Sequence, residues 1–159
     1  MLYFAFGSNL NPDQMTHRCP GHKVVGLAAL RDHRLVFPVV SREWGGGVAG
    51  VQVAHGSAVW GVAYELDEKH LEALDRYEGY HGAGDARNLY EREKIWVELT
   101  RPDDGSIPRR LRAEYYVIAN LASAAPPSRR YLDAILAGAR HHRLPDEYVA
   151  ALARTATVD

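Results

Sequence analysis

Short hydrophobic runs, each ended by turn-forming residues, predict strands in the first half of the chain. The first run, residues 2–6, ends at Gly7-Ser8-Asn9. Pro38 confines the next run to an edge or a bend, because proline cannot donate a hydrogen bond to a neighbouring strand. His55-Gly56-Ser57 predicts a turn between two further strands. The runs after the first are residues 33–40, 50–54 and 59–66.

Apolar residues at every second position predict a hairpin in the second half. Every second residue is apolar in residues 95–99 and 111–117. Pro102-Asp103-Asp104-Gly105 lies between them and has a turn composition, so the two segments are expected to pair. Residues 81–88 are polar and contain glycine, which predicts a loop.

Capping residues predict four helices. Asn11, followed by Pro12, begins a helix through His17. Asp67 caps a second helix, which ends at Gly79. The second helix has Leu71 and Leu74 on its buried face, with Leu66 and Leu71 as a hydrophobic staple. The last two helices are expected after Ser128, with Leu132, Ile135, Leu136 and Ala139 buried, and from Pro145 to about Arg154.

The order of these elements indicates an α+β fold. Strands do not alternate regularly with crossover helices, which favours an antiparallel or mixed sheet that could curl into a barrel. The chain has 159 residues, so one domain spanning residues 1–159 is expected.

Composition limits which binding partners and which cellular compartment are expected. The formal net charge is −1, from 19 Lys+Arg and 20 Asp+Glu, which gives no reason to expect binding to nucleic acid or to an anionic membrane surface. One cysteine precludes an internal disulfide and fits a reducing compartment. Residues 2–6 are too few for a signal sequence, and no apolar run is long enough to span a bilayer. A cytoplasmic protein is expected.

The turn at Gly7-Ser8-Asn9 is the first candidate for chemistry. A glycine lets the chain turn back, and the N–H groups that follow can face one concavity. Such a nest beside a helix start suits a carboxylate or a developing oxyanion. The alternative is an ordinary strand end with a Gly-Ser-Asn turn.

Glu78 is the second candidate. It is expected at the carboxyl end of the helix that begins at Asp67, where the helix dipole disfavours an exposed carboxylate by roughly 0.3–1 kcal/mol. Flanking by Tyr77 and Tyr80 would desolvate the carboxylate further. Both effects raise its pKa toward the range that suits a general acid/base. The alternative is an exposed glutamate that happens to precede a C-cap glycine.

Residues 45–50 (GGGVAG) formally match the dinucleotide-binding pattern G-x-G-x-x-G. That site requires a helix after the glycines, whereas Val51-Gln52-Val53 begins another strand-like run. A flexible hairpin loop is therefore the better interpretation, and a nucleotide-dependent enzyme is a weak alternative.

The eight histidines and the single cysteine show no metal-ligand spacing. His141 and His142 are adjacent, so their side chains would diverge by about 100° on a helix. Cys19 and His22 offer two ligands at most, without a second pair. A lone cysteine outside any recognised nucleophile motif is more often an inert packed residue. No metal site is expected.

Several further segments occur along the chain as short motifs: residues 3–10 (YFAFGSNL), 59–64 (VWGVAY), 74–79 (LDRYEG), 125–131 (APPSRRY) and 144–148 (LPDEY). Together they resemble the γ-glutamylcyclotransferase family. Each is only moderately specific alone, but they occur in the order found in the family. The resemblance extends from residue 2 to about residue 154.

The resemblance implies a small mixed or antiparallel β-barrel with peripheral helices. It implies that Glu78 is the catalytic acid/base and that no metal or organic cofactor takes part. Tyr90 and Tyr116 fall where the family often places substrate-facing tyrosines, with Tyr115 as the alternative to Tyr116. The glycine loop would bind the γ-glutamyl group through Tyr3, Phe6, Gly7, Ser8, Asn9 and Leu10. Many members have tyrosine where this chain has Phe6, so any hydrogen bond from that hydroxyl is absent here.

The activity implied is release of 5-oxoproline and a free amino acid or amine, by attack of the substrate's α-amine on its own γ-carbonyl. One alternative is a cyclotransferase specific for a γ-glutamylamine or a larger γ-glutamyl metabolite. Another is a non-catalytic small-molecule binding module on the same fold. The expected partner is a small γ-glutamyl compound, and the chain is expected to be a monomer or homodimer.

Overall fold

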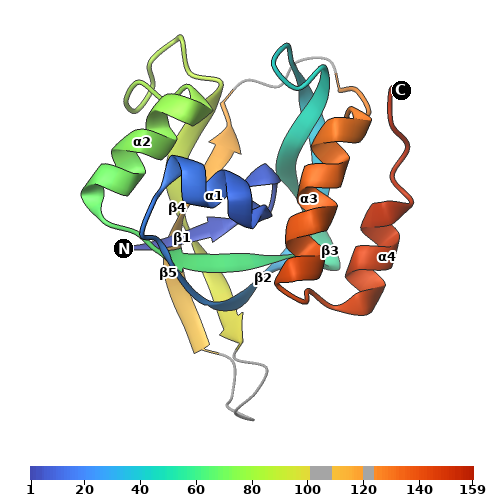
Figure 1. Cartoon of the computed structure of the whole chain (residues 1–159), viewed down its shortest axis with the longest axis horizontal. Helices are drawn as coiled ribbons and strands as arrows, with labels where there is room; N and C mark the ends of the chain where they lie inside the picture. The colour runs from blue at the N-terminus through green and yellow to red at the C-terminus, as the bar shows by residue number, and fades with distance from the viewer. Residues whose placement is uncertain (101–108, 120–123) are drawn as a thin grey trace.

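The computed structural model describes residues 1–100, 109–119 and 124–159 (Figure 1). Strands dominate the first two thirds of the chain, and two helices follow them. The elements are β1 (Leu2–Ala5), the 3-10 helix η1 (Ser8–Leu10), α1 (Pro12–Arg18), β2 (Lys23–Ser41), β3 (Gly46–Glu65), α2 (Glu68–Glu78), β4 (Tyr90–Thr100), β5 (Arg109–Ile118), α3 (Arg129–His141) and α4 (Asp146–Ala153).

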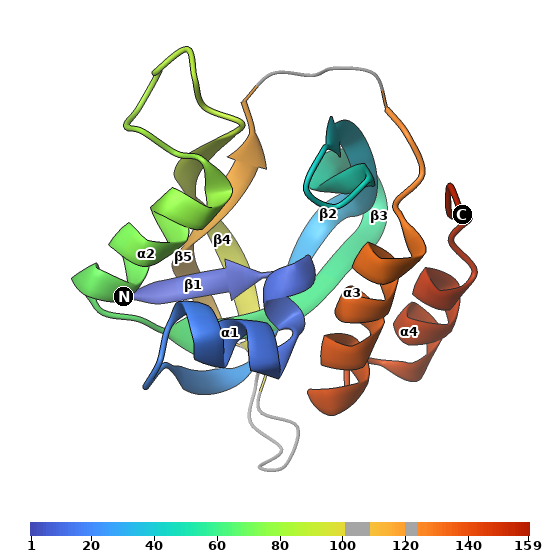
Figure 2. The ribbon, with the colours of Figure 1, turned by 45° about the horizontal axis from the view of Figure 1, so that its top comes forward.

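The strands close into a barrel in the order β1-β3-β2-β4-β5. β1 pairs with β3 in the antiparallel sense, with Tyr3 opposite Tyr64. On its other side it pairs with β5 in the parallel sense, with Tyr3 opposite Glu114. The barrel is therefore mixed, and the helices lie around its outside (Figure 2). This confirms the predicted α+β fold with a small mixed barrel and peripheral helices.

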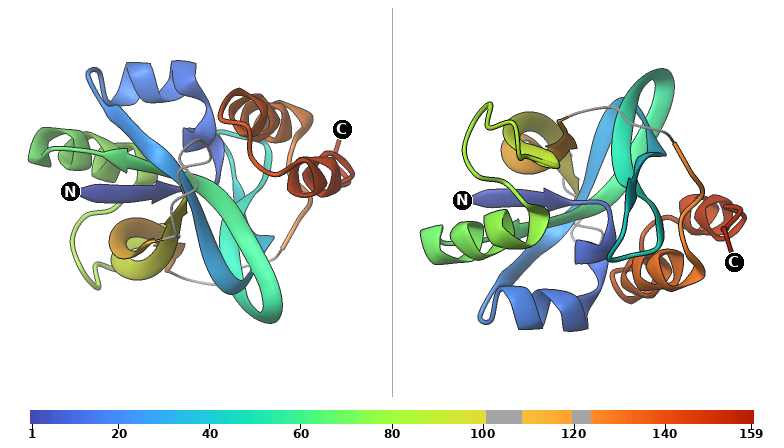
Figure 3. Two further views of the ribbon diagram at one scale, coloured as in Figure 1. Left: turned by 90° about the horizontal axis from the view of Figure 1, so that it is seen from below. Right: turned by 90° about the horizontal axis from the view of Figure 1, so that it is seen from above.

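The helices occupy different sides of the barrel. α2 lies on one side, whereas α3 and α4 pack against each other on the opposite side (Figure 3). η1 contacts both α1 and α3, and α1 also contacts α2. The segment that leaves β1 is therefore held between the helices of the two sides, which positions it for the site described below.

β3 is one continuous strand, so the predicted turn at residues 55–57 is wrong. The pairing jumps from Arg31–Ala58 to His33–Val53, which leaves the intervening residues as a bulge. Asp32 has φ 58° at this bulge, and its carboxylate accepts a hydrogen bond from the Gly56 N–H at 3.0 Å. The polar and glycine residues that suggested a chain reversal thus bend a long strand without ending it.

The glycine run is only partly a loop, because β3 already begins at Gly46. A Cβ atom on Gly46 would lie 2.5 Å from the backbone nitrogen of Ser128. The Gly47 N–H donates to the Pro126 carbonyl at 2.9 Å. These glycines therefore allow the segment before α3 to pack directly on the strand, a role that differs from both the predicted hairpin loop and a nucleotide-binding loop.

The predicted helix caps agree with the structure. The Asn11 side chain accepts from Asp13 N and Gln14 N at the start of α1. The Asp67 side chain accepts from His70 N at the start of α2, and Gly79 ends that helix with φ 68°. Ser128 likewise caps α3. Pro145 precedes the first residue of α4, one position earlier than expected.

The β4–β5 pairing confirms the predicted hairpin partners, with Ile95 opposite Ala113 and Val97 opposite Leu111. The turn predicted at residues 102–105 lies outside the described residues. No helix in the described ranges is long and apolar enough to cross a membrane.

Candidate active site

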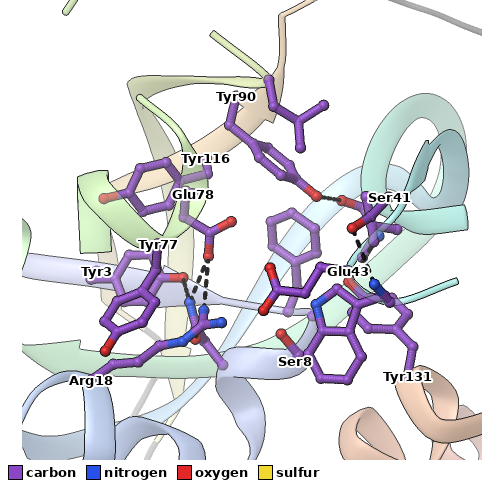
Figure 4. Close-up of a pocket in the computed structure, with 17 residues that line it drawn as sticks. Tyr3, Ser8, Arg18, Ser41, Glu43, Tyr77, Glu78, Tyr90, Tyr116 and Tyr131 are labelled. Atoms are coloured by element: carbon purple, nitrogen blue, oxygen red, sulfur yellow. Dashed lines mark hydrogen bonds and ion pairs between the residues drawn. The ribbon is translucent and has the colours of Figure 1, made fainter. Parts of the chain in front are cut away.

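A pocket opens between the carboxyl end of α2, the turn after β1 and the hairpin turn between β2 and β3 (Figure 4). It contains Glu78 and every predicted substrate-binding residue except Leu10. The residues predicted from sequence that line it are Tyr3, Phe6, Gly7, Ser8, Asn9, Glu78, Tyr90 and Tyr116.

Glu78 is the last residue of α2, and its side chain is 17% exposed. Its Oε1 accepts a hydrogen bond from Asn9 Nδ2 at 3.0 Å. The Arg18 guanidinium lies 3.5 Å from the same oxygen. The Glu78 carboxylate at the end of α2 therefore contacts the turn after β1 directly, although the two segments are far apart in sequence.

Burial raises the pKa of Glu78, and the charge of Glu43 raises it further, whereas Arg18 and the Asn9 hydrogen bond act in the opposite direction. The direction agrees with the expectation from the sequence. One expected cause is absent, because Tyr80 does not line the pocket. The Arg92 guanidinium carbon lies 5.5 Å from the centre of the Tyr80 ring. The carboxylate is instead enclosed by residues that are distant in sequence.

A hydrogen-bonded network fixes the amide of Asn9. Its Nδ2 donates to the Tyr3 hydroxyl at 2.9 Å as well as to Glu78. Its Oδ1 accepts from Gln14 Nε2 at 2.9 Å and from Arg18 at 3.0 Å. Because every polar atom of the amide is engaged, Asn9 holds Glu78 in one orientation.

Arg18 was not among the residues predicted from the sequence. The helix that carries it was expected to end at His17, and in the structure it ends one residue later. Gln14 and Arg18 are four positions apart and so share a face of α1. That spacing, next to Ser8 and Asn9, was the signal available in the sequence.

Three tyrosines form one wall of the pocket. The rings of Tyr3 and Tyr116 meet edge to face at 5.8 Å, and those of Tyr90 and Tyr116 at 6.5 Å. Tyr116 donates to Asp75 Oδ1 at 2.7 Å, and Tyr90 donates to the Ala49 carbonyl at 3.1 Å. Both hydroxyl groups therefore already donate hydrogen bonds within the protein.

Strand alternation decides which of Tyr115 and Tyr116 can face the pocket. Tyr116 lines the pocket and Tyr115 does not. Successive side chains on β5 point to opposite faces, so only one of the two can reach the site.

Limited space favours glycine in the turn after β1. Gly7 has φ −107°, which is outside the left-handed region. A Cβ atom there would lie 3.2 Å from both the Ala49 Cβ and the Tyr131 hydroxyl. The reason for glycine is thus close approach to neighbouring elements, and the sharp turn expected from the sequence is supplied by the following 3-10 helix.

Leu10 differs from the other candidates. It is fully buried in the hydrophobic core and does not line the pocket. Its carbonyl lies 3.1 Å from His142 Nε2. Leu10 therefore anchors the turn from behind, because the 3-10 helix rotates its side chain away from the residues that face the cavity.

Tyr131, from α3, is a pocket residue that the sequence analysis did not identify as part of the site. Its hydroxyl oxygen accepts a hydrogen bond from the Ala49 N–H at 2.9 Å. Burial raises the pKa of Tyr131, while the Ala49 and Ser8 N–H groups are among the influences that lower it. The hydroxyl oxygen thus joins α3 to β3 beside the Gly7-Ser8 turn, and it retains its proton at neutral pH.

Tyr131→Phe is expected to lower the free energy of unfolding by about 1–3 kcal/mol, because the buried Ala49 N–H would lose its acceptor. Urea denaturation would measure the change. Tyr77→Phe is the matched control, since that tyrosine is 46% exposed and its hydroxyl can be solvated by water. Equal stability of the two variants would contradict the assigned role of the Tyr131 hydroxyl.

The remaining walls carry no metal-binding arrangement in the part of the chain that the structure describes, where no group of three or more His, Cys, Asp or Glu side chains converges. Cys19 is fully buried and donates to the His70 carbonyl at 3.6 Å. Burial raises its pKa to about 11, so the thiol is not a nucleophile at neutral pH.

The chain matches the family model described as Gamma-glutamyl cyclotransferase, AIG2-like, over residues 3–154. It is 30% identical to the Gamma-glutamylcyclotransferase of Mus musculus and 33% identical to that of Homo sapiens. Each alignment spans 151 residues, 92% of this chain and 74% of the relative. A solved structure of a gamma-glutamyl cyclotransferase is similar with a TM-score of 0.87 at 29% identity, covering 100% of this chain and 89% of that chain. The chain therefore belongs to the AIG2-like gamma-glutamyl cyclotransferase family.

Proposed function

We propose that this protein is a γ-glutamylcyclotransferase that converts a γ-glutamyl compound into 5-oxoproline and a free amino acid or amine. The observation that carries the proposal is the meeting of Glu78 with the turn after β1: the carboxylate accepts from Asn9 at 3.0 Å in a pocket that Gly7 and Ser8 also line. A carboxylate with a raised pKa and adjacent backbone donors is the combination that acyl transfer requires.

In the proposed reaction the substrate supplies its own nucleophile. The α-amine attacks the γ-carbonyl carbon and forms the new C–N bond of a five-membered lactam. The bond from that carbon to the leaving nitrogen then breaks. Holding amine and carbonyl together can contribute roughly 7–11 kcal/mol, because the attack is intramolecular and its geometry is set by the pocket.

Glu78 would move the protons. Two protons pass overall from the α-ammonium nitrogen to the leaving nitrogen, which departs as an ammonium group. Glu78 would carry these two protons one at a time: in its ionised form it accepts a proton from the α-nitrogen, and in its neutral form it donates that proton to the leaving nitrogen, once for each proton. The contact with Asn9 keeps one carboxylate oxygen in place while the other remains available to the substrate. This role typically contributes about 10²–10⁴ in rate.

The oxyanion of the tetrahedral intermediate would form beside the Gly7-Ser8 turn. Gly7, Ser8 and Tyr131 border this part of the pocket, so a backbone N–H of the turn and the Tyr131 hydroxyl would be the donors. The Tyr131 oxygen already accepts from Ala49 N–H, which leaves its proton free to point at the substrate. Such donors contribute roughly 10²–10³ in rate.

Tyr3, Phe6, Tyr90 and Tyr116 would enclose the aliphatic part of the glutamyl group. Their side chains are buried, at 4% to 7% exposure, and provide an apolar surface. Phe6 adds surface without a hydroxyl. Asn9 would act on the substrate through Glu78, because its own amide is fully engaged.

The test is direct. Incubation of the purified chain with a panel of γ-glutamyl amino acids and γ-glutamyl amines is expected to yield 5-oxoproline, detected by mass spectrometry, together with the free amine. Ligand-dependent thermal stabilisation without any 5-oxoproline would instead favour a non-catalytic binding module. The burial of Glu78 speaks against that alternative, since burying a carboxyl group whose pKa is raised costs stability and gives no benefit to a pure binder of neutral or anionic groups.

A single domain over residues 1–159, a monomer or homodimer, and a cytoplasmic location are parts of the same proposal. A small γ-glutamyl metabolite as the substrate fits the near-neutral charge and the pocket. Size-exclusion chromatography with light scattering would determine the oligomeric state.

A further inference from the structure

The hairpin turn between β2 and β3 forms one rim of the pocket and is fastened to α3. The Arg130 guanidinium donates to the Glu43 carbonyl and lies 4.6 Å from the centre of the Trp44 ring. Trp44 in turn packs on Tyr131, with ring centres 4.9 Å apart. The backbone of the turn is therefore held against α3, which keeps Glu43 at this rim of the pocket.

Glu43 presents its carboxylate to the cavity. Figure 4 shows it pointing into the pocket from the side opposite Glu78. Its side chain is exposed, which places it at the mouth, whereas Tyr3 and Phe6 are buried deeper. Among the described residues, no ion pair involves Glu43.

The charged groups that line the pocket are unbalanced. They are one cation, Arg18, and two carboxylates, Glu43 and Glu78. Arg18 is held by Glu78 and Asn9 and stacks on Tyr77, 4.6 Å from the ring centre. It therefore compensates Glu78. Arg130 binds the Glu43 carbonyl, but among the described residues neither Arg130 nor any other cation forms an ion pair with the Glu43 carboxylate, which lies at the mouth.

The direction of the substrate follows from the proposed function. The glutamyl group must reach Glu78 and the Gly7-Ser8 turn, because the lactam forms there. The leaving group then extends toward the mouth, where Glu43 lies. A carboxylate on the leaving group would meet a like charge, and an ammonium group would meet an opposite one.

We infer that Glu43 selects γ-glutamyl amides whose leaving amine carries a second, positively charged amino group, such as an aliphatic diamine, over those that release an α-amino acid or another anionic amine. The inference rests on the proposed function and narrows its substrate class.

The experiment uses three γ-glutamyl amides with leaving groups of equal length and different terminal charge. These are the amides of 1,4-diaminobutane, which is cationic, of pentylamine, which is neutral, and of 4-aminobutanoate, which is anionic. The kcat/KM for 5-oxoproline release is measured with the full chain at low and high salt. We expect kcat/KM to be highest for the cationic amide, intermediate for the neutral one and lowest for the anionic one. The values for the cationic and anionic amides are expected to differ by roughly 10-fold or more, and this difference should shrink as salt screens the charges.

Glu43→Gln isolates the residue. In this variant the ratio of kcat/KM for the cationic amide to kcat/KM for the anionic amide is expected to fall at least 5-fold. Comparing this ratio cancels any effect of the substitution on Glu78 that both substrates share. Glu147→Gln, an exposed residue of α4 outside the pocket, removes the same charge and is expected to keep the wild-type ratio.

Each outcome bears on either the proposed function or the role of Glu43. No 5-oxoproline from any of the three amides would remove the proposed function and the inference together. Turnover of the neutral amide without a charge preference, or with preference for the anionic amide, would overturn the inference alone. An equal loss on all three amides in Glu43→Gln would assign Glu43 to the shared glutamyl ammonium and likewise overturn it.

Discussion

Glu78→Gln is expected to lower kcat/KM for 5-oxoproline release by at least 100-fold while the fold is retained. Glutamine can still accept the hydrogen bond from Asn9, so the packing around the site is preserved. It cannot exchange protons with the substrate, and that exchange typically contributes about 10²–10⁴ in rate. Steady-state kinetics on any γ-glutamyl amide that the wild type turns over would measure the loss.

Glu78→Gln is also expected to change how the melting temperature depends on pH. Burial raises the pKa of Glu78, so the folded chain favours the neutral carboxyl. The ionised form therefore costs stability as pH rises above the ordinary value of 4.5 toward the folded pKa. Glu78→Gln should consequently melt at or above the wild-type temperature at pH 7, and the two should converge below about pH 4.5.

Glu72→Gln is the matched control for both measurements, because Glu72 is an exposed residue of the same helix. Its activity and melting temperature should stay near those of the wild type. Retention of more than about a tenth of the wild-type rate by Glu78→Gln would rule out an acid/base role worth 100-fold. A variant that fails to fold would contradict the stability prediction, since the neutral side chain should be favoured there.

The second large effect is expected from Gly138→Ala in α3. On helix propensity alone this change should stabilise the protein by roughly 0.5–1 kcal/mol. A Cβ atom at this position would instead collide with the backbone of Leu10 and lie 2.6 Å from the Asn11 nitrogen. Overpacking against backbone typically costs about 1–3 kcal/mol, so we expect net destabilisation and a fall in melting temperature of roughly 2–12 °C.

Gly138→Ala should also reduce activity, because Leu10 follows Ser8 and Asn9 in the segment that lines the pocket. Ala137→Gly, an exposed change in the same turn of α3, is the control and should cost only about 1 kcal/mol through helix propensity. A melting temperature that rises in Gly138→Ala would show that the helix and the turn after β1 are not in close contact.

The position of the proposed acid was accessible from the sequence because local rules define it. Asp67 and Gly79 bound α2 through interactions that span three or four residues, and they leave Glu78 on the final turn. The same kind of local signal identified the caps of α1 and α3. Local signals failed at residues 55–57, where the turn-like composition produces a bulge that only the partner strand defines.

The sequence by itself determined the class of fold, the ends of most helices, and the residues of α2 and of the turn after β1 that are proposed to carry the chemistry. These follow from interactions between near neighbours and from the order of the motifs. Only the tertiary structure decided which groups surround Glu78. Arg18, Tyr131 and Glu43 reach the pocket because the barrel closes and brings α1, α3 and the β2–β3 turn to one place. Contacts between such distant segments depend on strand register and packing, which no local pattern specifies.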